Sequence, residues 1–477
     1  MSDFPTQLLI NGQWLDGSGA KRLAIVNPAT EETFTEVSSA TADEIGQAAE
    51  AGQAAFESGW RDMPPGERTR LLRNLAKRIH ENVETLAQLE TRNVGKPIGD
   101  ARWEADAGAK VFDYYAGAIG HLCGQTIPVA RGGFDFTLRQ PMGVIAAITP
   151  WNFPFLIACW KVAPALAAGN SVVLKPASLT PLTALMLGQL AQEAGLPDGV
   201  LQVVPGSGSE AGNALATHPL VRKIGFTGST EVGATIMKLA ADDIKRVSLE
   251  LGGKSPNIVF ADADWQRAAA ESPMSVFANT GQDCCARSRM FIEQSVFDGF
   301  VDQFVAATES LKIGDPMDEA TQVGPMVSAA QRELSESYIA GARDAGREIR
   351  TGGDRPNGGG FYLNPAVVTG VETEDRAWRE EIFGPVVCLR SFTDETEMLR
   401  EVNDTNFGLS GSVWSNDLSR ALRVARQVES GVISINSHSS VHTEAPFGGF
   451  KRSGLGRDLG MSAIEACTEV KNIYVGE

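Results

Sequence analysis

The run Val144-Ile-Ala-Ala-Ile148 starts a regular alternation of short apolar segments with longer segments of helical spacing. Four more apolar segments continue it: Ser171-Val-Val-Leu174, Val200–Val204, Lys223–Phe226 and Arg246–Leu249. Between them we expect helices at about 155–168 and 182–194, and from about 210 and 230. Strands that alternate with helices of about ten residues or more form a parallel sheet covered on both faces. The sequence therefore predicts a doubly wound α/β domain, which binds ligands at the carboxyl ends of its strands.

The same alternation begins again after Gly252-Gly253, which we interpret as the joint between two domains. Strands are expected at 256–260 and 290–293, and helices at 264–277 and 296–310. Upstream, Asn11-Gly12 between apolar runs predicts a hairpin turn. Thr41-Ala-Asp-Glu44 predicts a capping box that starts a helical layer ending near 115. We thus expect a first domain of residues 1–120 and 142–251, and a second domain of residues 252–450.

Charge and composition limit the kinds of partner. The formal net charge of −17 repels nucleic acid and anionic membranes. No stretch reaches the roughly 18 apolar residues of a membrane span, and the N-terminus lacks a signal-peptide pattern. The six cysteines include no Cys-x-x-Cys pair, and we interpret His438-x-x-x-His442 as loop residues rather than metal ligands. We therefore expect a cytoplasmic protein that binds a small molecule, without metal, nucleic acid or membrane.

Three separated segments contain the groups that could perform chemistry: Thr149-Pro-Trp-Asn-Phe-Pro154, Glu250-Leu-Gly-Gly-Lys-Ser-Pro256 and Asn279-Thr-Gly-Gln-Asp-Cys-Cys-Ala-Arg-Ser-Arg289. Acyl chemistry at a carbonyl needs a nucleophile, a base and an oxyanion donor, which a thiol, a carboxylate and an amide can supply. Spacing alone does not establish this, because an unpaired cysteine is most often a small buried apolar residue. A nucleotide-independent thiol hydrolase or acyltransferase and a non-catalytic binding protein are the alternatives.

These segments resemble the aldehyde dehydrogenase superfamily. The resemblance also rests on Phe226-Thr-Gly-Ser-Thr-Glu-Val-Gly233 and Glu380-Glu-Ile-Phe-Gly-Pro385, and it covers nearly the whole chain. The chain is similar to family members that oxidise betaine aldehyde and aminobutyraldehyde. The resemblance implies an oxidoreductase that converts an aldehyde to the acid with NAD or NADP, through a cysteine thiohemiacetal and a thioester that water hydrolyses. It also implies a homodimer or homotetramer, with residues 121–141 and 451–477 as a small β element for oligomerisation.

The resemblance assigns catalytic roles residue by residue. Cys284 matches the nucleophile, and the Asn152 amide with the Cys284 N–H would hold the oxyanion. Glu250 matches the base that activates water, as in the hydrolytic rather than the acylating branch. Lys161 matches a lysine near the catalytic water path, although a surface lysine is an equal alternative. Asp458 stands where relatives often carry Glu, which leaves its part in proton relay open.

Two glycine stretches compete for the cofactor phosphates. Gly206-x-Gly208-x-x-Ala211 nearly meets the dinucleotide fingerprint, but Pro205 intervenes after the strand, and we discount it. The stretch 226–233 ends a strand and opens a helix, whose free N–H groups suit a pyrophosphate. The resemblance places the cofactor there, and the full set of expected contacts is Thr149, Pro150, Trp151, Lys175, Ser178, Gly228, Ser229, Glu381 and Phe383. Many relatives carry Glu at the position of Ser178, so serine permits NADP without excluding NAD.

Substrate preference is less well marked. Four aromatic residues are candidates for an apolar tunnel, although such residues are more often core: Phe112, Tyr114, Phe153 and Trp160. Relatives that oxidise succinate semialdehyde have an arginine at the position of Trp160, which disfavours a substrate with a carboxylate. Asp283 resembles a residue of aminoaldehyde-oxidising members and could attract an ammonium group; a solvated or capping aspartate is an equal alternative.

Overall fold

The computed structural model describes residues 4–19, 21–439 and 441–476. Its first sheet has eight strands. Five parallel strands form the centre in the order β11 (Arg246–Glu250), β10 (Val221–Thr227), β7 (Val144–Ile148), β8 (Ser171–Lys175) and β9 (Leu201–Val203). Antiparallel strands extend both edges, with β19 (Gly454–Leu455) beside β11 and the hairpin β1 (Leu8–Ile10) and β2 (Gln13–Leu15) beside β9. The expected doubly wound sheet is therefore confirmed.

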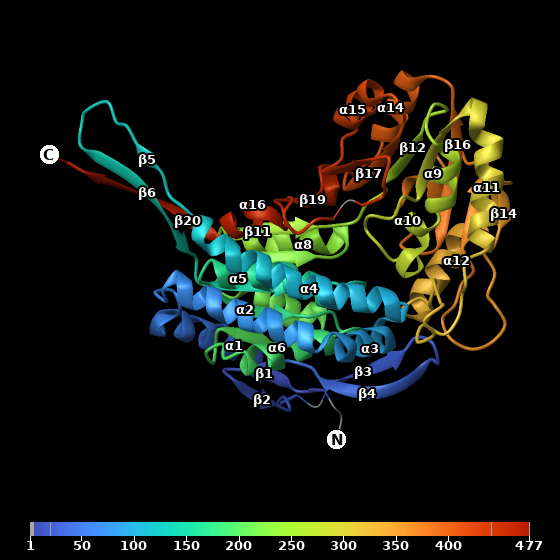
Figure 1. Cartoon of the computed structure of the whole chain (residues 1–477). Coiled ribbons are helices and arrows are strands. Elements are labelled where there is room, and N and C mark those ends of the chain that lie inside the picture. The colour runs from blue at the N-terminus through green and yellow to red at the C-terminus, as the bar shows by residue number, and fades with distance from the viewer. Residues whose placement is uncertain (1–3, 20, 440, 477) are drawn as a thin grey trace.

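Helices cover both faces of this sheet (Figure 1). On one face lie α5 (Pro154–Ala167) and α6 (Leu182–Glu193), with α2 (Pro65–Glu81), α3 (Val83–Val94) and α4 (Ile98–Ala118) packed outside them. The other face carries α1 (Ala42–Ala55), α7 (Asn213–Thr217) and α8 (Thr230–Ala241). The capping box at Thr41 and Glu44 starts α1, as expected. Residues Gly208–Gly212 form a π turn before α7, so that segment is less regular than the expected helix.

The second sheet has seven strands, in the order β14 (Glu348–Thr351), β15 (Ala366–Thr369), β16 (Val386–Phe392), β13 (Arg289–Glu293), β12 (Pro256–Val259), β17 (Ser410–Trp414) and β18 (Val432–Ile435). All pairs except β14 with β15 are parallel. Its helices are α9 (Trp265–Glu271), α10 (Met274–Phe277), α11 (Phe297–Glu309), α12 (Ala329–Asp344), α13 (Arg376–Arg379), α14 (Glu395–Asn403) and α15 (Leu418–Gln427). The single helix expected at 264–277 is broken in two at Pro273, which has no N–H to continue the hydrogen bonds.

A three-stranded sheet projects from the body as an arm (Figure 1). Its order is β20 (Thr468–Val475), β6 (Phe134–Pro141) and β5 (Thr126–Ile127), and β20 pairs with β6 of the same chain along its whole length. The segment expected at 451–477 is divided: β19 pairs with β11 and α16 (Gly460–Glu465) packs on α4 and α5. Only the part from Thr468 belongs to the arm, because the edge of β11 offers hydrogen bonds to β19.

A separate hairpin of β3 (Arg22–Asn27) and β4 (Glu32–Ser38) runs below both domains in Figure 1. Its turn reaches the second domain, where Pro28 accepts a hydrogen bond from the Phe361 N–H (2.9 Å). The chain crosses from the first sheet to the second through Leu251–Ser255, which contains the expected glycine joint. Within the described ranges, no helix combines the length and the apolar character of a membrane span.

Candidate active site

Cys284 lies on a loop that is held tightly before β13. Asn279 and Thr280 adopt left-handed backbone conformations (φ 48° and 58°), followed by Gly281 at φ 72°. A Cβ on Gly281 would lie 2.2 Å from the Gly384 carbonyl oxygen, so this position requires glycine. The next residue, Gln282, is fully buried, and its side-chain oxygen accepts the Val327 N–H (2.9 Å). The loop therefore presents the Cys284 thiol from a fixed backbone.

The loop after β7 is tied to the Cys284 loop by two amide hydrogen bonds. The Asn152 side-chain amide donates to the Gln282 carbonyl (2.9 Å), and the Asn279 amide donates to the Asn152 carbonyl (2.9 Å). Asn152 is buried, and one of its two amide hydrogens satisfies Gln282. The second hydrogen remains available to an oxygen bound beside the thiol.

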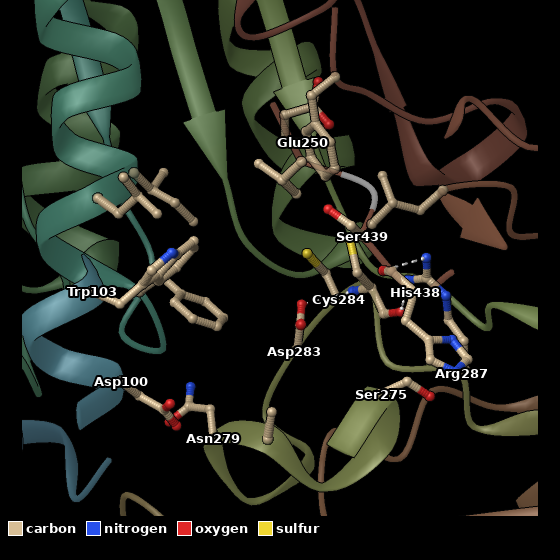
Figure 2. A pocket seen from close by; sticks show the side chains of 18 of the residues that line it. Asp100, Trp103, Glu250, Ser275, Asn279, Asp283, Cys284, Arg287, His438 and Ser439 are labelled. Atoms are coloured by element: carbon tan, nitrogen blue, oxygen red, sulfur yellow. Dashed lines mark hydrogen bonds between the residues drawn. The ribbon is translucent and has the colours of Figure 1, made fainter. Parts of the chain in front are cut away.

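Two cavities meet at Cys284. A cavity of about 500 Å³ lies on the α4 and α5 side, and its aromatic wall includes Phe153, Trp160 and Phe447. Figure 2 shows Cys284 and Asp283 at its centre, with Trp103 and Asp100 of α4 facing them. A second cleft of about 750 Å³ runs along the carboxyl ends of the first sheet and also reaches Cys284. The thiol thus stands where two ligands could meet.

Glu250 ends β11 and lines the smaller cavity, above Cys284 in Figure 2. Its carboxylate is buried, and neither oxygen has a hydrogen-bond partner in the described part of the chain. Burial, and then the negative charge of Asp458, raise the pKa of Glu250 well above its usual value. A buried carboxyl without protein partners is suited to hold a water molecule and to accept its proton.

Lys161 does not line either large cavity. Its ammonium group forms a buried salt bridge with Asp458 (2.9 Å), behind Glu250. Both residues line a small internal space of about 20 Å³ together with Lys223. Lys161 and Asp458 therefore lie side by side, and the charges of both act on the pKa of Glu250.

All nine expected cofactor contacts line the larger cleft. The Lys175 ammonium group is buried and donates to the Pro176 carbonyl (3.1 Å), and burial lowers its pKa to about 8. The Ser178 hydroxyl donates to the Gly206 carbonyl (2.9 Å). The buried hydroxyl oxygen of Thr149 has no hydrogen-bond partner among the described residues. These groups leave unused hydrogen-bonding capacity at the carboxyl ends of β7 and β8.

The N-terminus of α8 and the second domain close the cleft. Ser229 caps α8, and the N–H groups of its first turn face the cleft beside Gly228. From the other side, Glu381 accepts the Gly253 N–H (2.9 Å), and burial raises its pKa to about 7. Phe383 is held in a left-handed conformation (φ 57°) with its ring edge-on to Trp151 at 5.2 Å. The cleft thus fits a dinucleotide, whose phosphates would lie at α8.

Some functional candidates differ from the sequence-based expectation. Phe153 and Trp160 line the smaller cavity, whereas Phe112 is fully buried in the core and Tyr114 is not among the lining residues. Gly208 and Ser209, in the glycine stretch that we discounted, do line the cofactor cleft. Sequence analysis also missed the lining residue Arg287, since a basic residue after a cysteine has no distinctive spacing. The expectation that no metal binds stays a prediction.

The doubly wound sheet and a dinucleotide-sized cleft lined by both Cys284 and Asn152 are features of a nucleotide-dependent oxidoreductase. The sequence profile of the aldehyde dehydrogenase family matches residues 14–473. Betaine aldehyde dehydrogenase 1 of Oryza sativa is 43% identical over 476 residues, which cover 98% of this chain and 94% of the relative. Phenylacetaldehyde dehydrogenase of Pseudomonas fluorescens is 43% identical over 482 residues, with 99% and 96% covered.

Solved structures agree with this similarity. The NAD+ complex of an aldehyde dehydrogenase from Bacillus cereus has a TM-score of 0.97 and 40% identity, covering 99% of this chain and 96% of that one. An NADP-dependent enzyme of Escherichia coli has a TM-score of 0.98 and 40% identity, covering 99% and 98%. The chain belongs to the aldehyde dehydrogenase family. It is an oxidoreductase that converts an aldehyde to the carboxylic acid with NAD or NADP, and the hydrolase alternative is not favoured.

Proposed function

We propose that Cys284 is the nucleophile of this reaction, because its thiol lies where the substrate cavity and the cofactor cleft meet. The thiolate attacks the aldehyde carbon and forms a thiohemiacetal. The free hydrogen of the Asn152 amide and the Cys284 N–H stabilise the oxyanion. The hydrogen bond from Asn152 to Gln282 (2.9 Å) keeps this amide in place before the substrate binds.

The residues of the larger cleft would hold the cofactor, which would supply the hydride acceptor. Loss of hydride from the thiohemiacetal on Cys284 leaves a thioester on the sulfur. Glu250 then takes a proton from water, and the resulting hydroxide attacks the thioester carbonyl. The carboxylic acid leaves, and Cys284 is free again. The Lys161–Asp458 pair lies behind Glu250, and we propose that it sets the charge around this carboxyl rather than contacting the substrate.

For the cofactor, we propose that Ser178 permits NADP, since the serine brings no negative charge to the cleft wall beside Lys175. Replacing it in Ser178→Glu should favour NAD by on the order of 1–3 kcal/mol, because the carboxylate repels a 2′-phosphate and accepts from the ribose hydroxyls. The measurement is kcat/KM with each cofactor. Ser178→Gln is the matched control, because glutamine has the size of glutamate but no charge. A wild type without NADP turnover would contradict this reading of the cleft.

For the substrate, we propose an aldehyde whose tail carries an amine. Four carboxyl groups line the cavity, from Asp100, Glu250, Glu271 and Asp283. Trp103, on the α4 side of the cavity, is 58% exposed. The lining lysine, Lys96, is already engaged in a buried salt bridge with Glu104. Arg287 also lines the cavity, on the side opposite Trp103 and Asp100 (Figure 2). A cationic tail at the α4 side would therefore find a carboxylate and an aromatic face.

A panel of matched aldehydes tests this proposal. We expect kcat/KM to be highest for an aminoaldehyde or betaine aldehyde, lower for phenylacetaldehyde, and lowest for succinate semialdehyde, whose carboxylate the acidic lining repels. Asp100→Asn should reduce the preference for the amine without affecting phenylacetaldehyde. Equal values for phenylacetaldehyde and the amines would assign the cavity to apolar aldehydes instead.

For assembly, we propose a homodimer or homotetramer formed through the arm of β5, β6 and β20. β20 is an edge strand, and the arm exposes Phe134 (53%), Val470 (58%) and Tyr474 (51%). Exposed apolar edge strands are sites of pairing between chains. A monomer in sedimentation velocity would contradict this proposal.

The free state of all six cysteines supports a reducing compartment. We therefore propose a cytoplasmic location. Recovery of the protein in an organelle or periplasmic fraction would contradict it.

A further inference from the structure

Arg287 is a buried arginine in the wall of the substrate cavity (Figure 2). It follows Cys284 by three residues, and only 2% of its surface is exposed. The main-chain N–H of Arg287 donates to the Ser275 carbonyl (3.0 Å), which fixes the loop against α10. The backbone of Arg287 is therefore fixed three residues after the nucleophile.

Among the described residues, the guanidinium group of Arg287 hydrogen-bonds only to uncharged acceptors. One nitrogen donates to the Cys285 carbonyl (2.5 Å), and Nε donates to the Ser412 hydroxyl (3.1 Å). The remaining contacts are longer, to the carbonyls of Gly411 (3.5 Å) and His438 (3.4 Å). Because none of these acceptors carries a negative charge, the hydrogen bonds leave the buried positive charge uncompensated. A buried charge of this kind requires an opposite charge nearby.

The acidic groups that interact with Arg287 belong to the nucleophile loop. Burial lowers the pKa of Arg287, while the negative forms of Cys285, Asp283 and Cys284 act in the opposite direction. Asp283 also accepts the Cys285 N–H (2.8 Å), so its carboxylate lies within the same loop. Arg287 thus lines the same cavity as Cys284, and among the acidic groups of this loop Cys285 and Asp283 act on it more strongly than Cys284.

His438 does not supply a second positive charge to this wall. Its ring lies between the hydroxyl groups of Ser272 (3.2 Å) and Ser412 (3.3 Å). Burial, and then the charges of Arg287 and Arg267, lower the pKa of His438 to about 3. The ring is therefore neutral near pH 7, and it connects Ser272 to Ser412, which accepts a hydrogen bond from Arg287.

The thiol needs such a partner, because its other neighbours oppose ionisation. The hydrogen bond with Cys285, then burial, then the charges of Cys285, Asp283 and Glu381 raise the pKa of Cys284. Glu250 of β11 also lines the cavity. The remaining lining cation, Lys96, is paired with Glu104 and with Glu90 (3.7 Å). Arg287 is the lining cation whose charge is not taken up by a carboxylate salt bridge in the described residues.

We propose that Arg287 is a positioning residue that holds the Cys284 loop through the Cys285 carbonyl and stabilises the Cys284 thiolate with its buried charge. This inference rests on the proposed role of Cys284 as nucleophile. It assigns the activation of the thiol to a charge within its own loop, independently of Glu250.

The rate of alkylation of Cys284 by iodoacetamide as a function of pH tests this proposal without cofactor or aldehyde. All variants carry Cys285→Ala, so that the peptide followed by mass spectrometry has one thiol. Arg287→Gln should move the apparent pKa of Cys284 upward by about one unit, since it removes an opposite charge. Arg287→Lys keeps the charge, so the apparent pKa of Cys284 should stay within about 0.3 units of the value in the parent protein.

Arg267→Gln is the matched control. Arg267 is a nearby arginine that is paired with Glu271 (3.0 Å) and donates to the Asn436 carbonyl (2.8 Å), so its replacement should leave the profile unchanged. If Arg287→Gln and Arg287→Lys lower activity equally and neither shifts the alkylation profile, the arginine is merely structural and the proposal fails. Cofactor titration and thermal unfolding verify that each variant is folded.

Asp283→Asn gives a second test that does not require any Arg287 variant to fold. The amide keeps an oxygen for the Cys285 N–H but removes the carboxylate that competes for the arginine and repels the thiolate. The alkylation profile should move to lower pH. An unchanged profile would show that the charges of this loop do not act on the thiol, and the proposal would be wrong. An unchanged profile would not contradict the proposal that Cys284 is the nucleophile, because Cys284→Ala tests that proposal separately.

Discussion

Cys284→Ala should abolish aldehyde oxidation, with a loss in kcat on the order of 10⁴–10⁶-fold, while cofactor affinity changes little. The reason is positional, since Cys284 is the residue of the pair that reaches both the substrate cavity and the cofactor cleft. The assay is the absorbance of reduced nicotinamide with saturating aldehyde. Fluorescence titration with NAD and NADP verifies that the cleft remains formed.

Two further variants separate the thiol from its surroundings. Cys285→Ala should remain active, and its activity profile should shift to lower pH, because the contact with Cys285 raises the pKa of Cys284. Asn152→Ala should lower kcat by roughly 10²–10³-fold through loss of one oxyanion donor. If Cys285→Ala is inactive and Cys284→Ala is active, the other sulfur is the nucleophile.

The first sheet could be predicted closely because its strands are buried on both faces. Strand β7 has the expected bounds, and β8, β10 and β11 differ by one or two residues at their ends. A buried parallel strand is a short continuous apolar run, which is a clear signal in a sequence. The nine expected cofactor contacts line one cleft for a related reason, since most of them follow strands or open helices at one sheet edge.

The features that sequence analysis missed depend on contacts between distant segments. The division of the C-terminal segment at Thr468 follows from the pairing of β19 with β11, about 200 residues away in sequence. The side chain of Arg287 is held by Ser412 and by the His438 carbonyl, both more than 100 residues away in sequence. Pro273 was visible in the sequence, yet the helical spacing on both sides obscured the break between α9 and α10.

Glu250→Gln should stop turnover after one chemical cycle. Attack by Cys284 and hydride transfer do not use the activated water, whereas hydrolysis of the thioester does. Pre-steady-state kinetics should therefore show a burst of reduced nicotinamide of about one equivalent per active site, followed by a slow steady rate. Intact-protein mass spectrometry should find the acyl group on Cys284 in the variant and not in the wild type.

The pH dependence gives the same residue an independent test. Glu250 acts as a base only when ionised, and its pKa is raised by burial and by Asp458, so the steady-state rate of the wild type should rise with pH through that raised pKa. Asp458→Asn removes the negative charge and should move this rise to lower pH. It also frees Lys161 from its salt bridge, and the positive charge of Lys161 acts in the same direction. In Glu250→Gln this dependence should disappear from the steady rate, whereas the burst should keep a separate pH dependence that reports Cys284. Normal turnover of Glu250→Gln, or transfer of the acyl group to coenzyme A instead of water, would place the chain among acylating enzymes.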